Sequence, residues 1–282
     1  MCKKYLIFAL CIITISFTGC QKQKEKIEET QLEEQSEEAV DEEKTAEGLV
    51  SEEELSGLPQ DVADLMRTLN KTAGSYGLGI VTDADLSLNG KLIQGTYGMQ
   101  AEVQLLRDSK TDDLEMVMNS TSDLDGAAAH AYYKDGWYYT DDANGKLKEE
   151  KSNEEVWDSV TEITGLVVDS ADSIEQMEVS QENGSTVYRY QIPAGMAEDY
   201  LNQMIAKVAV QNTDLKGAKV EVESVEMKST VDKDGMLTGQ KMTLSGDAKK
   251  SILKVPAEAV VNVSFSKIET DFLEMPDFSS YS

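Results

Sequence analysis

Cysteine and histidine are almost missing from this chain of 282 residues, and their scarcity disfavours several classes of function. The three cysteines are Cys2, Cys11 and Cys20, so no disulfide or thiol chemistry is available beyond residue 20. His130 is the only histidine, and one imidazole without cysteine partners makes neither a zinc site nor a catalytic triad. No phosphate loop or nucleophile elbow is present either. We therefore expect no catalytic residue, no metal, no cofactor and no enzymatic activity.

Positive charge is also scarce. The chain holds 26 Lys and Arg against 53 Asp and Glu, which gives a formal net charge of −27. Binding to nucleic acid or to an anionic lipid surface depends on Lys and Arg that neutralise phosphates. We therefore expect no nucleic-acid partner, whereas protein, neutral and cationic partners remain open.

Long apolar runs are missing except at the N-terminus. Lys3 and Lys4 precede an apolar run over residues 5–17, and Thr18-Gly19-Cys20 follows it. This order is typical of a secretory signal peptide, here residues 1–19. Its end resembles the bacterial lipobox, with Phe17 at a position where that motif usually has Leu. The resemblance implies cleavage before Cys20, lipid on its sulfur and anchoring at the outer face of the cell membrane. An ordinary secreted protein or an uncleaved anchor is the alternative.

Residues 20–54 lack the composition of a folded segment. From Gln21 to Glu54 there are fourteen acidic residues, four lysines and no aromatic residue. Such a segment cannot bury enough apolar surface to offset the entropy lost on ordering. We expect a disordered acidic stalk behind a lipidated Cys20, with a cation-binding tail as the alternative. No Pro- or Gly-rich linker divides the remainder, so residues 55–282 are expected to form one domain.

Apolar and polar residues alternate in several segments of that domain, the pattern of antiparallel strands with one buried face. Asn-Gly and Asp-Gly pairs lie between the segments, and they tolerate the positive φ of tight hairpins. The alternation changes phase near Ser224-Val225, which predicts a bulge or a bend. The expected buried stripes are Ala101, Val103 and Leu105; Leu114, Met116 and Met118; Tyr188, Tyr190 and Ile192; and Ala259, Val261, Val263 and Phe265.

Three segments have helical periodicity instead: residues 59–73, 152–166 and 194–211. Ser152 and Glu155 form the sequence pattern of a capping box at the start of the second. Strands in runs with a few helices between them predict an α+β fold. We expect a large curled antiparallel sheet, a half-open β-barrel, with about three helices packed on one face.

One hairpin carries a resemblance to a known family. Residues 132–139 have the sequence Tyr-Tyr-Lys-Asp-Gly-Trp-Tyr-Tyr, and Asn-Gly-Lys-Leu-Lys follows at 144–148. Together with the order of elements, this resembles the LolA/LppX-like lipoproteins, closest to uncharacterised Gram-positive members with an acidic stalk. The resemblance implies a half-open barrel whose concave face holds acyl chains or other apolar molecules. It transfers no site residue.

Methionine supplies the candidate ligand-binding residues. Its flexible, polarizable side chain suits surfaces that accept varied apolar ligands, although filling of the core is the more common role. If a concave sheet forms, Met116 and Met118 on one strand, with Met204 and Ile205 on a helix, are expected to line it. These four residues are the predicted ligand contacts.

Other conspicuous residues have ordinary explanations. The aromatic hairpin at 132–139 is either a docking surface or, as we favour, cross-strand packing. The Asp-rich stretches at 141–145 and 232–235 lack the calcium loop with Gly at its sixth position and are expected to be solvated turns. Asp83 and Asp85 share one face of a strand but have no evident acid–base partner.

Two functions from different classes follow. The first is a membrane-anchored extracytoplasmic lipoprotein that binds a lipid or another apolar ligand in the concave sheet. The second is a non-catalytic module that recognises a protein of the cell envelope, with a filled concavity. A continuous open groove would favour the first, and bulky side chains that meet across the hollow would favour the second.

Overall fold

The computed structural model describes residues 52–90, 94–108, 113–123, 128–143, 145–156, 174–211, 215–250, 253–270 and 272–282. The expected signal peptide, Cys20 and the acidic stalk as far as residue 51 lie outside these ranges, as do residues 157–173, which hold most of the second predicted helix.

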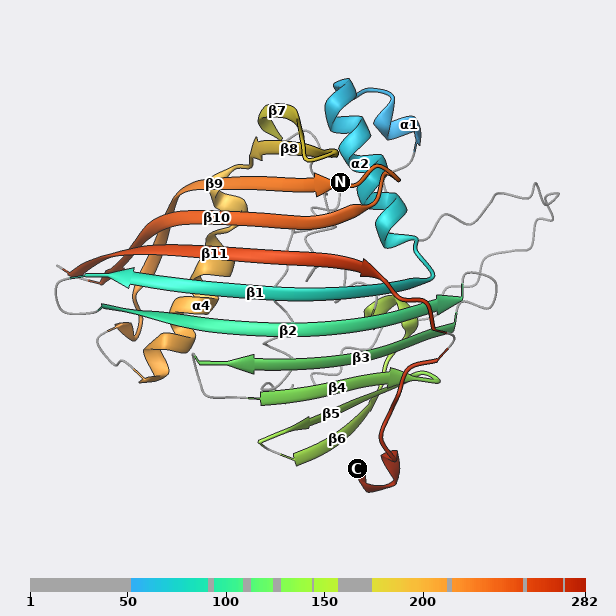
Figure 1. Cartoon of the computed structure of the whole chain (residues 1–282). Coiled ribbons are helices and arrows are strands. Elements are labelled where there is room, and N and C mark those ends of the chain that lie inside the picture. Colours follow the sequence, from blue (N-terminus) through green and yellow to red (C-terminus); the bar gives the residue numbers. More distant parts are fainter. Residues whose placement is uncertain are drawn as a thin grey trace, which may run out of the picture.

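Eleven antiparallel strands form one sheet (Figure 1). The order is β6-β5-β4-β3-β2-β1-β11-β10-β9-β8-β7, so β6 and β7 form its two edges and the described sheet is open. The first strand pairs with the last at the centre. The strands are β1 (Gly77–Asn89), β2 (Gln94–Asp108), β3 (Asp113–Ser122), β4 (Ala128–Lys134), β5 (Trp137–Asp142), β6 (Gly145–Glu150), β7 (Glu175–Glu182), β8 (Ser185–Gln191), β9 (Lys219–Val231), β10 (Leu237–Lys250) and β11 (Leu253–Lys267).

The predicted alternation gives the sheet an inner, buried face and an outer, wetter face. In β1, Ile80, Ala84 and Leu86 are buried, while Val81 and Asp85 between them are exposed. All the apolar stripes predicted from the sequence are buried on the inner face, apart from the half-buried Ile192. Side chains alternate with a period of two along a strand. Once one residue of a strand is known to face inward, every second residue from it faces inward as well, and these residues form the core.

Two of the predicted Asn-Gly and Asp-Gly pairs form hairpin turns with positive φ at both residues, whereas in Asp234-Gly235 only Gly235 has positive φ. Asp135-Gly136 joins β4 to β5 with φ of 53° and 79°, and Asn183-Gly184 joins β7 to β8 with φ of 52° and 84°. Both residues of each pair have positive φ, which a two-residue hairpin turn requires. Asn144 and residues 124–127 lie outside the described ranges.

The predicted phase change is a β-bulge in β9. Ser224 pairs with Ser245 and Val222 with Gly246, so Glu223 is left without an opposite residue. A Cβ at Gly246 would lie 2.4 Å from the backbone oxygen of Glu221, hence only glycine fits opposite the bulge.

Among the described helices, α2 and the pair η3 and α4 agree with the predicted segments 59–73 and 194–211. They are α1 (Glu52–Leu55), α2 (Gln60–Ala73), the 3₁₀ turn η3 (Ala194–Met196), α4 (Glu198–Gln211) and a C-terminal 3₁₀ turn η5 (Phe278–Ser280). Residues 153–156 are also helical, and their capping box is present: the Ser152 N–H donates to Glu155 Oε2 at 2.8 Å, and the Glu155 N–H donates to Ser152 Oγ at 3.2 Å. The Ser152 N–H, and the Ser152 hydroxyl that donates to the same carboxylate at 3.0 Å, hold the pKa of Glu155 below its ordinary value.

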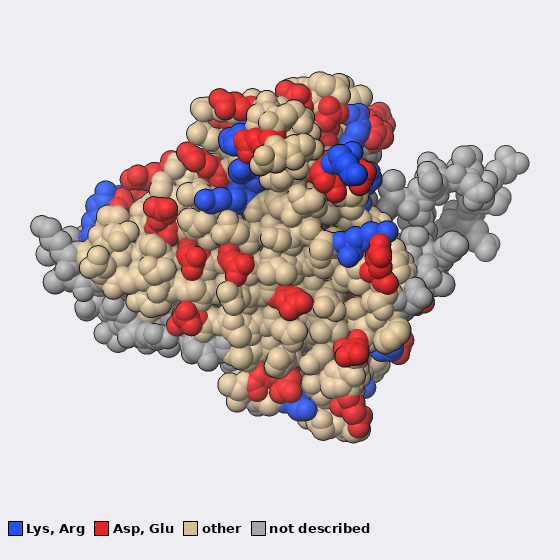
Figure 2. Space-filling model, in the orientation of Figure 1, with Lys and Arg blue, Asp and Glu red and all other residues tan. Residues whose placement is uncertain are grey.

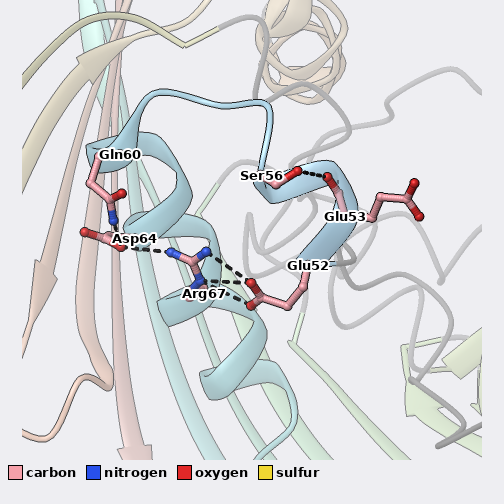
Figure 3. A network of polar contacts seen from close by, with 6 residues as sticks. All are labelled: Glu52, Glu53, Ser56, Gln60, Asp64 and Arg67. Carbon is pink, nitrogen blue, oxygen red and sulfur yellow. Dashed lines mark hydrogen bonds and ion pairs between the residues drawn. The ribbon is translucent and has the colours of Figure 1, made fainter.

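The short helix α1 was not predicted. In the sequence it spans the boundary between the expected stalk and the expected domain. Arg67 of α2 bonds Glu52 of α1 at 3.1 Å and Asp64 of its own helix at 3.0 Å (Figure 3). Leu55 at the end of α1 is buried in the core. Exposed ion pairs contribute little to stability. The burial of Leu55 therefore contributes more than the ion pair to holding α1 against the domain.

The C-terminal segment crosses from β11 to the far end of the sheet and packs on its outer face (Figure 1). The Phe278 ring stacks on Tyr139 with centroids 3.8 Å apart, and Tyr281 meets Tyr139 edge-on at 5.4 Å. Lys148 N–H donates to the Ser282 carbonyl at 3.3 Å, which covers part of edge strand β6. The outward-facing rings of the aromatic hairpin are therefore occupied by this chain's own terminus.

Candidate functional site: the inner face of the sheet

The four predicted ligand contacts all face the interior. Met116 and Met118 lie on β3, and Met204 and Ile205 lie on α4; each is 0–3% exposed. They belong to one continuous hydrophobic cluster, in which β3 and α4 supply separate parts. Whether any of them touches a ligand stays a prediction.

Two helices lie toward opposite ends of the long strands, α4 behind the left part of the sheet and α2 near its right end in Figure 1. The side-chain oxygen of Asn202 in α4 accepts from the N–H of Val220, the second residue of β9, at 3.1 Å. At the other end of that hairpin, the N–H of Leu237 in β10 donates to Thr72 Oγ1 of α2 at 3.0 Å. The inner-face residues between these two contacts of a helix with the β9–β10 hairpin form the middle of the candidate site.

A transverse row of uncharged, mostly small side chains crosses this middle zone. Strand register places Ala101 of β2 and Val263 of β11 on either side of Thr82 in β1. The same row continues to Gln240 and Ser229 on one side, and to Ser120 and Ala129 on the other.

Larger residues lie two positions away on several of these strands, although on one side β1 and β3 have only Ala84 and Ser122. One flank has Ile80, Val103, Met118 and Phe265, and the other has Met99, Val261, Met242 and Met227. Two flanks four residues apart are separated by about 13 Å between Cα atoms. We call the row of Ala129, Ser120, Ala101, Thr82, Val263, Gln240 and Ser229 the inner trough.

The centre of the inner trough keeps a little surface exposure. Thr82, Ala101, Val263 and Gln240 are each 6–8% exposed. By contrast Leu86, four residues further along β1 and in register with Ala259, is 0% exposed, as Ala259 is. The middle of the inner face, where Phe265, Met242 and Met227 of the flanks are also 6–8% exposed, is therefore slightly less enclosed than the Val220 end of the sheet.

Two buried hydroxyls on the inner face have no hydrogen-bond partner within the described part of the chain: Thr82 Oγ1 and the Tyr138 OH. Burial, with the Glu149 charge adding, raises the pKa of Tyr138, so its hydroxyl stays protonated. An unpaired buried hydroxyl costs about 1–3 kcal/mol, which makes each position unusual.

The other polar groups of the trough satisfy one another. Gln240 Nε2 donates to Ser229 Oγ at 3.2 Å, and the Tyr190 OH lies 3.4 Å from the same oxygen. Burial raises the pKa of Tyr190 above its ordinary value. This cluster is uncharged and lies on β8, β9 and β10.

The outer face has hydrophilic hollows, but the described residues around the one at Asp83 and Asp85 form no recognisable binding site. Asp83 and Asp85 border a hollow of about 300 Å³ above Gly98, together with Asp123. His130 Nδ1 lies 2.6 Å from Asn119 Oδ1 on this exposed side. Figure 2 shows Asp and Glu scattered across the sheet, with Lys and Arg mainly toward its upper and right parts.

Neither ions nor membrane spans are indicated in the described ranges. No group of three or more His, Cys, Asp and Glu side chains there is arranged to hold a metal. Asp232 Oδ1 accepts from the N–H groups of Asp234 and Met236, both at 2.9 Å, as in an ordinary Asp-initiated turn. Within the same ranges, no helix is both long and apolar enough to cross a membrane.

Sequence reasoning missed Thr82, Gln240 and Ser229. A signal for them existed, because each is a polar residue in phase with buried apolar neighbours: Thr82 between Ile80 and Ala84, and Gln240 two residues before Met242. Polar residues that share the buried phase of a strand mark either an internal hydrogen bond or a site.

No family model matches this chain, and no curated protein matches it. Solved structures similar to it include the lipoprotein LppX of Mycobacterium tuberculosis, at 13% identity over 77% of this chain and 95% of that one, with a TM-score of 0.35. A putative outer membrane lipoprotein-sorting protein domain from Vibrio parahaemolyticus matches at 12% identity over 78% and 95%, with a TM-score of 0.26. A DUF1329 family protein from Desulfovibrio piger matches at 9% identity over 75% and 93%, also with a TM-score of 0.26.

The first two carry names of the group that the sequence resembles. At these identities and TM-scores they assign no residue and no activity to this chain. The candidate site depends on the inner-face geometry alone, and the Gram-positive relationship stays a prediction.

Proposed function

We propose that this protein is a lipoprotein of the bacterial cell envelope, anchored through Cys20, that binds a lipid or another apolar ligand on the inner face of its sheet without catalysing a reaction. The observation that carries the binding proposal is the inner trough: a contiguous row of uncharged, mostly small side chains, with Met118 on one flank and Met99 on the other, and with a hydroxyl at its centre that has no partner in the described residues.

Charge supports an apolar or uncharged ligand. The trough and the two flanking rows hold no charged side chain among the described residues of β1–β3 and β8–β11. Burying a charge without a partner is costly, so a site of this composition excludes charged groups. Methionines on both flanks, Met118 and Met99, give the walls the adaptability that varied acyl chains require.

A protein-interaction module of the envelope is the second candidate. It is favoured by the burial of Met116, Met118, Met204 and Ile205 to 3% or less, because side chains that already fill the interior need no ligand. The trough, which retains exposure, is the observation against it.

Mass spectrometry of copurifying molecules tests the choice. The full chain, with an affinity tag inserted within residues 21–51, is purified from bacterial membranes in detergent and extracted with organic solvent. An unrelated lipoprotein purified in parallel sets the level of carried-over membrane lipid. We expect one apolar species near one molecule per chain above that level. A lipid content equal to that of the control would contradict ligand binding and leave the interaction module.

A further inference from the structure

Three basic side chains lie side by side on the outer face of the sheet, across β8, β9 and β10. Arg189 lies opposite Lys228, and Lys228 lies opposite Lys241. Like charges that are directly opposite each other on paired strands destabilise a sheet. Carboxylates are abundant in this chain, with 53 Asp and Glu against 26 Lys and Arg, yet none lies between these three residues. The row is therefore stabilised only by anions that lie beside it.

The protein supplies one carboxylate directly to this row. Glu182 of β7 accepts hydrogen bonds from Arg189 and, at 3.3 Å, from Lys228 Nζ. Arg189 also donates to Ser180 Oγ at 3.0 Å. Lys241 is exposed, and its side chain forms no ion pair or hydrogen bond with the described residues. The Lys241 end of the row is therefore open to an anion from outside the chain.

The row borders a hollow of about 350 Å³ on the outer face. Two carboxylates and three uncharged polar side chains are among the other residues that line it: Glu178, Glu226, Gln176, Gln191 and Thr243. Neither carboxylate forms an ion pair within the described part of the chain. Glu226 precedes Lys228 by two residues on β9, so their side chains share one face and their Cα atoms are about 7 Å apart. The hollow therefore has a cationic side and an anionic side a short distance apart.

We propose that this hollow binds a short peptide with free termini, of two or three residues, through both of its terminal charges. The peptide carboxylate lies between Lys228 and Lys241, and the peptide ammonium group lies beside Glu226. Extended backbone advances about 3.3 Å per residue, so the termini of such a peptide are spaced like the two sides of the hollow. Side-chain amides and hydroxyls both donate and accept, so Gln191 and Thr243 bond to the peptide groups between the ends.

The mixture of charges distinguishes a zwitterion from other ligands. A lone anion, such as phosphate, would be repelled by the carboxylates of Glu178 and Glu226 while it is attracted by the cations. A polyanion or an anionic membrane would also face the Asp and Glu side chains that Figure 2 shows scattered over the rest of this face. A longer peptide would carry its second terminus beyond the hollow. The hollow lies on the opposite face of the sheet from the inner trough, so this inference is independent of the proposed function.

Saturation-transfer NMR on the full chain in non-ionic detergent tests the proposal, because the method measures weak binding. The probes are alanyl-alanine, its N-acetyl form and its C-terminal amide, which share one backbone and differ in a single terminal charge. We expect alanyl-alanine to bind most tightly and each blocked form to bind severalfold more weakly, since exposed charge pairs each contribute modestly. Added salt is expected to weaken the binding of alanyl-alanine through screening.

Two exposed residues separate the contacts of the two termini. Lys241→Gln is expected to weaken binding of alanyl-alanine and of its N-acetyl form severalfold, without weakening binding of the amide. Glu226→Gln is expected to weaken binding of alanyl-alanine and to strengthen binding of the N-acetyl form, because it removes a carboxylate near an anionic ligand. Lys219→Gln is the matched control: it makes the same charge change at the exposed first residue of β9, outside the hollow, and is expected to bind like the wild type.

Three results would overturn the inference. If alanyl-alanine does not bind, the hollow is not a peptide site. If all three probes bind equally, the terminal charges are not recognised. If Lys241→Gln and Glu226→Gln both bind alanyl-alanine like the wild type, the peptide binds elsewhere on the protein. Each of these results leaves ligand binding on the inner face standing, because no residue of the inner trough is changed.

Discussion

Thr82 is a residue at which stability and binding are expected to oppose each other. Its buried hydroxyl has no partner in the described residues, which lowers the stability of the ligand-free protein, and the same hydroxyl lies at the centre of the proposed ligand site. A substitution at this position that raises the free energy of unfolding and also weakens ligand binding would be hard to explain by packing alone.

Thr82→Val is therefore predicted to stabilise the ligand-free protein. Removing a buried hydroxyl without a partner should raise the free energy of unfolding by about 1 kcal/mol, or Tm by about 2–4 °C for a domain of this size. Thermal unfolding followed by circular dichroism measures the change. The control is Thr121→Val, which removes an exposed hydroxyl from the outer face of β3 and should leave Tm unchanged. A lower Tm for Thr82→Val would show that the hydroxyl already has a partner in the folded protein.

The residues of the site were predictable only in part. Alternation placed Met116 and Met118 on the buried face of their strand, and the structure puts them there. The trough was not predictable, because it depends on which residues of different strands come into register. Thr82 and Val263 are neighbours only because β1 pairs with β11. Local sequence carries no information about a pairing between segments so far apart.

At the scale of single elements, the bulge in β9 shows how one extra residue constrains its partner strand. Glu223 has no opposite residue, and the two strand backbones approach closely at Gly246. The change of phase in the sequence indicated the bulge, whereas the need for glycine in the facing strand became evident only from the backbone distances.

Gly246→Ala is predicted to destabilise the protein by about 1–3 kcal/mol, because the new methyl group would overlap the Glu221 backbone oxygen. Denaturant unfolding gives the magnitude. Gly239→Ala in the same strand is the control, since a Cβ there would lie at an ordinary 3.5 Å from the Val263 oxygen. Equal losses of stability in the two variants would mean that replacing any glycine of β10, and not the overlap at the bulge, causes the destabilisation.

The C-terminal segment is a second element whose role can be tested. Phe278 is stacked on Tyr139, and the backbone N–H of Leu273 lies 3.5 Å from the Glu115 carboxylate. Removing the Phe278 ring should free the last turn from the sheet and leave the sheet folded, because the rings lie on the outer face and Phe278 is not part of the core cluster.

Phe278→Ala is accordingly predicted to speed proteolysis within residues 272–282 severalfold and to lower Tm only slightly. Limited proteolysis followed by mass spectrometry locates the cuts. Phe272→Ala is the comparison, since that ring is 67% exposed. Unchanged proteolysis in Phe278→Ala would mean that other contacts, such as the bond from Lys148 to Ser282, hold the segment.

At the scale of the whole molecule, the architecture was largely predictable. The α+β class, a large antiparallel sheet and the positions of α2 and α4 agree with the prediction from alternation and helical periodicity. Strand order was not predicted, and the second helix is described only at its capped start. Period and turn chemistry are local properties, whereas strand order is decided by contacts across the whole domain.

The proposed membrane anchor concerns the whole chain and is tested at Cys20. Cys20→Ala is predicted to abolish incorporation of an alkyne-bearing palmitate and to shift the protein away from the membrane fraction, because stable anchoring requires the lipid chains. Metabolic labelling and cell fractionation measure both. Cys11→Ala, within the expected signal peptide, should change neither, and palmitate incorporation that persists in Cys20→Ala would refute the assigned lipidation site.

The pairing of the first strand with the last also constrains how the protein folds after synthesis. Leu78 of β1 lies opposite Lys267 of β11, so the centre of the sheet closes only when nearly the whole chain is available, which under the proposed export means after translocation. Contacts between such distant segments make folding slow. Until then β1 presents an unpaired edge to its surroundings, a hazard for aggregation. We therefore expect newly exported chains to depend on extracytoplasmic folding factors, and truncation before β11 to yield a product that is degraded rather than a smaller stable domain.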